Sequence, residues 1–210
     1  MLFGNTSPPV LVGVAIALIV GITFHEFSHA FSADWLGDHR PRALGRVSLN
    51  PLRHLDPIGS IFLLIAGFGW GKPVPVNAYA LRPGRIGMTV VALAGPIANF
   101  AVAVVAALLF RGLDVAGLLG SDFGRSVGFF VVYFNLALGF FNLLPVPPLD
   151  GYNVLLPLLP PRQAFTVQRY AQYGYLVLLG LVVLSYGSSG GPLDWLFGLV
   201  GGLAAGMTGA

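Results

Sequence analysis

The sequence contains no cysteine and very little charge. The absence of cysteine among 210 residues excludes disulfide bonds and thiolate metal ligands, and it leaves the redox compartment undetermined. Only 9% of the residues are charged and 56% are hydrophobic, a balance that excludes an ordinary soluble domain. Together with a mean hydropathy of +0.81, this composition indicates an integral membrane protein.

Charged residues are not only few but also dispersed. The net charge is +3, and the eleven basic residues are scattered through short segments between apolar runs. Because no concentrated basic patch is present in the sequence, we expect no nucleic-acid partner. The basic residues are informative about orientation instead, since short cytoplasmic loops of membrane proteins collect Lys and Arg.

Long apolar runs recur along the whole chain and predict an all-α polytopic membrane protein. The runs cover residues 10–24, 88–110, 127–144, 176–184 and, more weakly, 193–207. We expect a single integral-membrane domain over residues 1–210, with its core over about 8–151 and additional C-terminal transmembrane helices over about 165–210. No Lys or Arg precedes the first run and no small-residue cleavage signal follows it, so we interpret it as a retained helix and not as a signal peptide.

The first apolar run belongs to a helix that we predict over residues 8–36. Ser7 is a candidate N-cap, prolines occupy the first helical positions, and Gly37 is a candidate stop. The helix carries the motif HEFSH, residues 25–29, about 26 Å from its start and near its far end. We therefore expect the motif to lie close to one membrane interface.

Arginines indicate which interface this is. They follow the first helix closely, at Arg40, Arg42, Arg46 and Arg53, and so predict that the motif lies toward the cytoplasm. The apolar part of residues 56–73 is about 14 residues long, which is typical of a re-entrant element. With that interpretation, nine of the eleven basic residues are cytoplasmic. The short pieces 45–50 and 72–77 are candidates for a small β element.

The HEFSH motif has the spacing of a zinc site. On a helix, His25 and His29 are one turn apart on the same face and can reach one ion. Glu26, the only glutamate in the chain, is offset from that face and can hold a metal-bound water instead of the metal. The alternative is that both histidines only hydrogen-bond to neighbouring helices. Ionisable residues inside a membrane usually have a function, so the zinc site is the favoured interpretation.

A catalytic zinc ion needs a third protein ligand and an open position for water. With no cysteine and no second glutamate, the candidates are the aspartates, His39 and His54. Asp150 is favoured because it follows a predicted spanning helix at the cytoplasmic face, the depth of the HEFSH motif. Three nearby prolines break that helix and allow irregular backbone to present a carboxylate. The alternative is a loop aspartate that only stabilises the turn after it.

These residues together resemble the site-2 protease family of intramembrane zinc metalloproteases, in the small prokaryotic form without a PDZ domain. The resemblance rests on five motifs in order: HEFSHA (25–30), GRVSLNPLRHLDPIG (45–59), GWGKPVPVN (69–77), ALAGPIANF (92–100) and FFNLLPVPPLDG (140–151). It implies a catalytic core of three spanning helices, which carry His25, Asn99 and Asn142.

The resemblance also implies the chemistry of the site. It implies one zinc ion per chain, with His25, His29 and Asp150 as ligands. It implies that Glu26 is the general base. Asn142, Asn99 and His54 match family motifs and are candidate oxyanion or substrate contacts. For both asparagines, hydrogen bonding between helices is the alternative role.

The expected function is zinc-dependent cleavage of transmembrane segments of other membrane proteins near the cytoplasmic face. The expected location is the lipid bilayer of a prokaryotic inner membrane, with the active site toward the cytoplasm. The alternative is a non-catalytic membrane protein that binds zinc structurally or transports metal. Transport predicts further ionisable residues along a path through the membrane, and the apolar runs are nearly free of them. The sequence does not indicate a specific substrate or an oligomeric state.

Overall fold

Three long helices form the centre of the molecule. The computed structural model describes residues 8–59, 70–82, 84–119, 122–187 and 190–209. The three helices are α1 (Pro8–Trp35), α4 (Arg85–Val115) and α5 (Asp122–Asn142), and each is long and apolar enough to cross a membrane. The prediction of an all-α protein is therefore confirmed, and the three helices expected to span the membrane are present as candidate spans.

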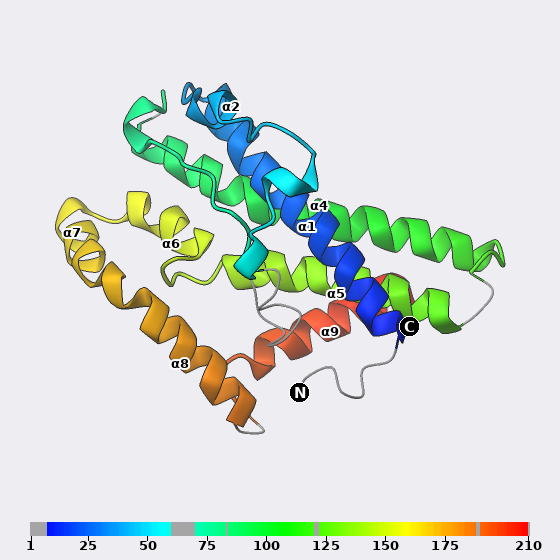
Figure 1. The fold of residues 1–210 in the computed structure, drawn as a ribbon. Coiled ribbons are helices and arrows are strands. Elements are labelled where there is room, and N and C mark those ends of the chain that lie inside the picture. The colour runs from blue at the N-terminus through cyan, green and yellow to red at the C-terminus, as the bar shows by residue number, and fades with distance from the viewer. Residues whose placement is uncertain (1–7, 60–69, 83, 120–121, 188–189, 210) are drawn as a thin grey trace.

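Shorter helices connect and flank this core. They are α2 (Arg40–Ala43), η1 (Pro51–Arg53), η2 (Ala78–Ala80), α6 (Asp150–Leu155), η3 (Leu156–Leu158), α7 (Pro161–Tyr170), η4 (Ala171–Tyr173), α8 (Gly174–Gly187) and α9 (Asp194–Thr208). Figure 1 shows α7 at the left of the view and α8 at the lower left, while α9 lies beside α5.

The three long helices pack closely because small residues line their contacts. Ala17 of α1 and Ala103 of α4 are fully buried, and Val132 of α5 is buried in the cluster that also contains Val200 of α9. The outer faces of the helices are apolar as well, and Leu108 on α4 is an exposed example. An apolar outer face suits a helix whose other neighbour is lipid.

The predicted β element is not formed in the described part of the chain. Residues 45–50 and 72–77 contain no strand, and Leu55 makes a single antiparallel bridge with Gly71. Pro73 and Pro75 lack the N–H group that a ladder needs, which explains why the pairing does not extend. Most of the predicted re-entrant element, residues 60–69, lies outside the described residues.

The prediction of additional C-terminal transmembrane helices is wrong for the residues that the structure describes. Helix α8 has 14 residues and α9 has 15. A spanning helix needs about 20 residues, so both are too short to cross alone. An apolar run does not show where its helix begins or ends. Helix α8 ends at Gly187, and α9 begins only at Asp194.

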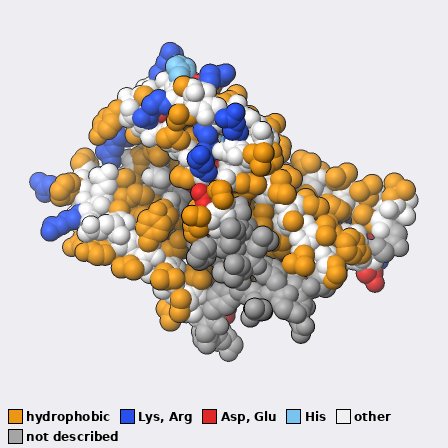
Figure 2. Space-filling view, viewed as in Figure 1, with side chains coloured by type: hydrophobic (Ala, Val, Ile, Leu, Met, Phe, Trp, Pro, Cys, Tyr) orange, Lys and Arg blue, Asp and Glu red, His pale blue; other side chains and the backbone are white. Residues whose placement is uncertain are grey.

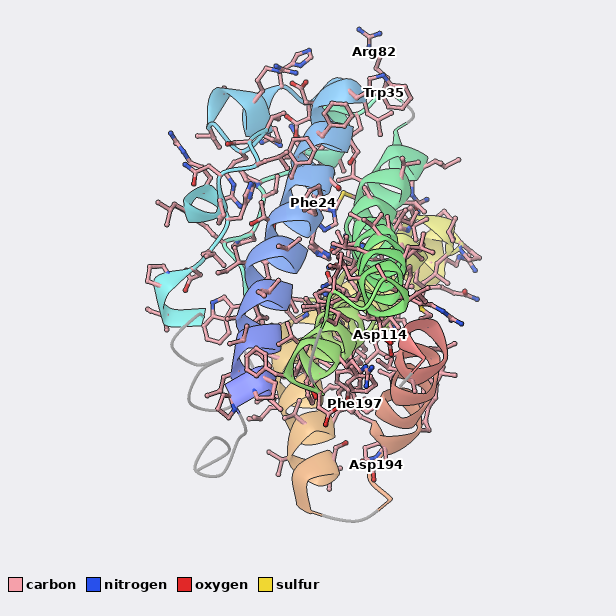
Figure 3. All side chains as sticks on the ribbon, turned by 90° about the vertical axis from the view of Figure 1, so that its right-hand side faces the viewer. Phe24, Trp35, Arg82, Asp114, Asp194 and Phe197 are labelled. Carbon is pink, nitrogen blue, oxygen red and sulfur yellow. The ribbon has the colours of Figure 1, made fainter. Side chains whose placement is uncertain are left out.

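Basic side chains are concentrated at one end of the core. Figure 2 shows Lys and Arg side chains gathered over the end that carries α2, with hydrophobic side chains covering much of the remaining visible face. Figure 3 places Trp35 and Arg82 at one end, and Asp114 farther toward the other. The basic end is also the C-terminal end of α1.

Candidate metal centre

Two helices that are distant in sequence bring three ligand-type side chains together. His25 and His29 lie on α1, and Asp150 is the first residue of α6, after the proline-containing turn that follows α5. Their nearest atoms are mutually close: the two imidazole Nε2 atoms are 3.1 Å apart, and Asp150 Oδ2 lies 3.1 Å from His25 Nε2 and 3.2 Å from His29 Nε2. The three residues form a group that could hold a metal ion.

Hydrogen bonds on the far side of each ring decide which nitrogen faces the group. His25 Nδ1 lies 2.7 Å from the side-chain oxygen of Asn99, and His29 Nδ1 lies 2.7 Å from the backbone oxygen of Val91. Both oxygens accept hydrogen bonds, so each Nδ1 carries the proton and donates it. Each Nε2 therefore presents a lone pair to the centre, as a metal ligand must.

This donor set fits a zinc ion. Three atoms with lone pairs, two of them nitrogens and one a carboxylate oxygen, face each other at 3.1–3.2 Å. Donor atoms of a tetrahedral zinc site, with bonds of about 2.0–2.2 Å, are roughly 3.3 Å apart. Among the described residues, no group donates a hydrogen bond to the buried Asp150 Oδ2. A cation between the three atoms removes their repulsion and satisfies that oxygen.

Gly95 of α4 leaves the space that the two rings occupy. A Cβ atom at this position would lie 2.6 Å from His29 Cε1 and 2.7 Å from His25 Cε1. Any larger residue would therefore displace the imidazoles. The glycine of the ALAGPIANF motif is explained by this close approach of α4 to the ligand rings.

Glu26 lies beside the three-residue group and not within it. Its carboxylate Oε2 is 3.9 Å from Nη2 of Arg46, which is buried and also donates a hydrogen bond to the backbone oxygen of Lys72. Burial lowers the pKa of the Arg46 guanidinium, and the nearby Glu26 carboxylate opposes this effect. A Cβ atom at Gly71 would lie 3.1 Å from Glu26 Oε1. Glu26 is thus held between Arg46 and the backbone at residues 71–72.

The two histidines considered as alternative ligands have other partners. His54 is fully buried, with Nε2 2.6 Å from the backbone oxygen of Ser48, and its own backbone oxygen accepts from the Lys72 N–H at 2.6 Å. It connects the loop after α2 to the segment beside Glu26. His39 Nδ1 lies 2.9 Å from Asp34 Oδ1, and its ring is largely exposed. Neither belongs to the three-residue group.

The two asparagines singled out from the sequence have different surroundings. Asn99 is fully buried and accepts from His25, as described above. Asn142 donates through Nδ2 to the backbone oxygen of Leu138, one turn earlier in its own helix, at 2.9 Å. A third amide, Asn135, was not predicted; it is fully buried and bonded to Asn99. The sequence did contain a signal for Asn135, because this polar residue interrupts the apolar run of α5.

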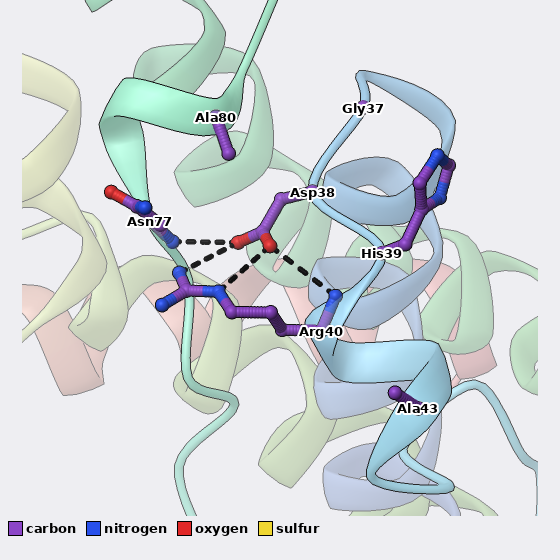
Figure 4. A pocket seen from close by; sticks show the side chains of 7 residues that line it. All are labelled: Gly37, Asp38, His39, Arg40, Ala43, Asn77 and Ala80. Atoms are coloured by element: carbon purple, nitrogen blue, oxygen red, sulfur yellow. Dashed lines mark hydrogen bonds and ion pairs between the residues drawn. The ribbon is translucent and has the colours of Figure 1, made fainter.

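A second group of charged residues lies in the loop that follows α1 and contacts residues 77–80. Figure 4 shows Asp38 in the pocket between this loop and residues 77–80, bonded to Arg40 and to the backbone N–H of Asn77. The hydrogen bonds from Arg40 lower the pKa of Asp38 to about 2 although the carboxyl is buried. Both oxygens of Asp38 accept hydrogen bonds from these groups. We therefore interpret the Asp38 pocket as a structural contact between two loops.

Comparison with known proteins agrees with this geometry. The family described as Peptidase family M50 matches residues 121–185, a range that includes Asp150. The curated relatives include YwhC of Bacillus subtilis, which is 39% identical over 83% of this chain and 82% of its own length. The chain belongs to peptidase family M50.

Other relatives of this M50 member come from distant organisms. Rip2 of Mycobacterium tuberculosis is 32% identical over 95% of this chain and 80% of its own length. MJ0611 of Methanocaldococcus jannaschii is 32% identical over 73% of this chain and 74% of its own length. All three relatives carry the name "Putative zinc metalloprotease". No solved structure is significantly similar to the chain. The predictions of the site-2 protease family, M50, and of a zinc metalloprotease are confirmed.

Proposed function

We propose that this M50 member is an intramembrane endopeptidase that cleaves transmembrane segments of other membrane proteins near the cytoplasmic face. The observation that carries the proposal is the set of three converging donor atoms on and beside spanning helices. His25 lies about 26 Å from the start of α1, so the site is near one end of the core and not at its middle. The basic end of the molecule supports a cytoplasmic location of the site. We propose that the membrane is a prokaryotic inner membrane.

The residues of the chain divide the work of peptide hydrolysis between them. Zinc bound by His25, His29 and Asp150 would polarise the peptide carbonyl and make water more acidic. Glu26 takes a proton from the attacking water as its oxygen bonds to the carbonyl carbon. Glu26 then gives that proton to the amine nitrogen as the carbon–nitrogen bond breaks. Asn99 and the Val91 carbonyl hold the imidazole rings in place during both steps.

A transmembrane substrate must expose its backbone before it can be cut. The carbonyl groups of a helix are occupied by the helix's own hydrogen bonds, so the segment has to unwind locally. The irregular backbone at residues 72–77 begins beside Glu26 and lacks helix or strand pairing among the described residues. We propose that Val74 and Val76, which alternate with the prolines and keep their N–H groups on one edge of this segment, pair with the unwound substrate, as in peptide recognition by strand addition. The other proposed partner is the bilayer, and we propose no nucleic-acid partner.

A cleavage assay with a single-span model substrate in proteoliposomes tests this function. Glu26→Gln keeps the shape of the side chain but cannot accept the proton, so we expect cleavage to fall by roughly 10²- to 10⁴-fold while about one zinc ion per chain is retained. The matched control is Asp122→Asn, the same chemical change on a fully exposed side chain at the start of α5, which should cleave normally.

Two results would contradict the proposal. One is cleavage that survives Glu26→Gln, and the other is wild-type protein that purifies without zinc and does not bind it. Zinc flux across the vesicle membrane without any cleavage would favour the alternative of a metal transporter.

A further inference from the structure

Two buried amides connect α5 to a zinc ligand on α1. Asn99 of α4 and Asn135 of α5 are both 0% exposed. Asn99 Nδ2 lies 3.3 Å from Asn135 Oδ1 and 3.2 Å from the backbone oxygen of Gly21 on α1. The other end of the Asn99 amide, Oδ1, faces His25 Nδ1 at 2.7 Å. A continuous chain of hydrogen bonds therefore runs from Asn135 through Asn99 to His25.

The direction of each hydrogen bond in this chain is determined by its first member. Asn135 Nδ2 donates to the backbone oxygen of Val131 in its own helix at 2.9 Å, so its Oδ1 is the atom left to face Asn99. Asn99 must then present Nδ2 to that oxygen, which leaves its own Oδ1 for His25. An oxygen at this place requires the proton on His25 Nδ1 and so frees Nε2 for the metal.

Close packing of α1 against the two amides holds this chain of hydrogen bonds in place. A Cβ atom at Gly21 would lie 2.7 Å from Asn135 Oδ1 and 3.2 Å from Asn99 Nδ2. Only glycine at this position allows α1 to approach both amides. A buried amide without partners is costly in a membrane, so the amides favour the arrangement in which every donor meets an acceptor.

We propose that Asn135 is a positioning residue for the metal centre: it orients the Asn99 amide, and that amide holds His25 in the tautomer that binds zinc. The inference rests on the proposed function only in taking His25 as a zinc ligand. Without Asn135 Oδ1, the Gly21 oxygen alone orients Asn99, and the amide can turn its NH₂ group toward His25. The competing tautomer, with the proton on Nε2, cannot bind the ion.

The test compares Asn135→Leu with Asn135→Asp in the full chain in detergent micelles. Leucine has a similar size but no acceptor, whereas aspartate keeps an acceptor for Asn99 in either protonation state. Loss of one neutral hydrogen bond corresponds to up to about a tenfold change in an equilibrium. We expect Asn135→Leu to weaken zinc binding about tenfold, measured by competition with a chromophoric chelator, and Asn135→Asp to stay within about threefold of wild type.

A second measurement separates positioning from folding. Nitrogen-15 NMR of histidine-labelled, zinc-free protein reports the tautomer of His25, identified by its absence in His25→Gln. Wild type and Asn135→Asp should show the Nδ1-protonated form, and Asn135→Leu should show a mixture with the Nε2-protonated form. The control is Thr23→Val, which removes another buried hydrogen bond of α1, to the backbone oxygen of Ile19. It should change neither zinc affinity nor tautomer.

The outcomes distinguish this inference from the proposed function. Wild-type zinc affinity and an unchanged tautomer in Asn135→Leu would overturn the role of Asn135 alone. Equal losses in the leucine and aspartate variants would also overturn it, because they would point to packing. Failure of the wild-type protein to bind zinc would instead overturn the proposed function.

Discussion

At the scale of single residues, the metal centre depends on what occupies the far side of each ligand. The histidine rings donate to Asn99 and to the Val91 carbonyl, whereas Asp150 Oδ2 has no donor among the described residues. Each ring therefore has a hydrogen-bond partner at Nδ1, and only its Nε2 atom, which faces the other two residues of the group, is left for a metal. This pattern is expected of a metal site, and it supports that role over two histidines that only bond to neighbouring helices.

Asp150 is the proposed ligand whose role is easiest to isolate. Asp150→Ala leaves two neutral imidazoles and removes the negative charge, so we expect zinc content to fall from about one ion per chain to less than 0.1. Metal analysis of protein purified in detergent checks this, with Asp122→Asn as a control that should keep its zinc. Full zinc occupancy in Asp150→Ala would show that another residue provides the third ligand.

At the scale of elements, the loop after α1 is joined to the segment before α4 through the Asp38 carboxylate, which accepts from the backbone of Asn77. Asp38 is bonded to Arg40 on one side and to the Asn77 backbone on the other. Asp34 is similarly paired with Arg42. These contacts lie at the basic end of the core. The loop that follows the ligand helix is therefore held in place at the same end as the proposed site.

The Asp38 contact predicts a loss of stability in acid. Its pKa is about 2 in the folded protein against an ordinary 3.8, so the carboxylate stabilises the fold above about pH 4 and the effect disappears as the pH falls toward 2. Because Arg40 is half-exposed, we discount the effect to about 1 kcal/mol. Thermal unfolding in micelles should show Asp38→Asn less stable than wild type at pH 7, with the difference shrinking between pH 4 and 2. A difference independent of pH would contradict this.

At the scale of the whole molecule, the candidate metal centre brings together residues that are distant in sequence. His25 and His29 belong to α1, whereas Asp150 begins α6, after the turn that ends α5. The amides of Asn99 and Asn135 add α4 and α5 to the same region. A bound ion therefore connects the first spanning helix to the C-terminal third of the chain.

Removal of zinc should consequently destabilise the whole fold. Binding to the folded state alone contributes about 4 kcal/mol when free zinc is 1,000-fold above its dissociation constant, which corresponds to roughly 10 °C in a chain of this size. We expect a chelator to lower the Tm of wild type by about this amount, and to leave the Tm of Asp150→Ala unchanged. The same chelator effect in both proteins would mean that the stabilising ion lies elsewhere.

The sequence alone determined much of the protein because its strongest signals are local. Long apolar runs predicted the three candidate spanning helices, and the spacing of His25 and His29 predicted two imidazoles on one helical face. The tertiary structure alone decided the rest. Composition does not show where a helix stops, so α8 and α9 were predicted as spanning helices, and the β element was predicted although its prolines prevent pairing. Asn135 was missed because an amide acquires a role only through its neighbours, and those lie on two other helices.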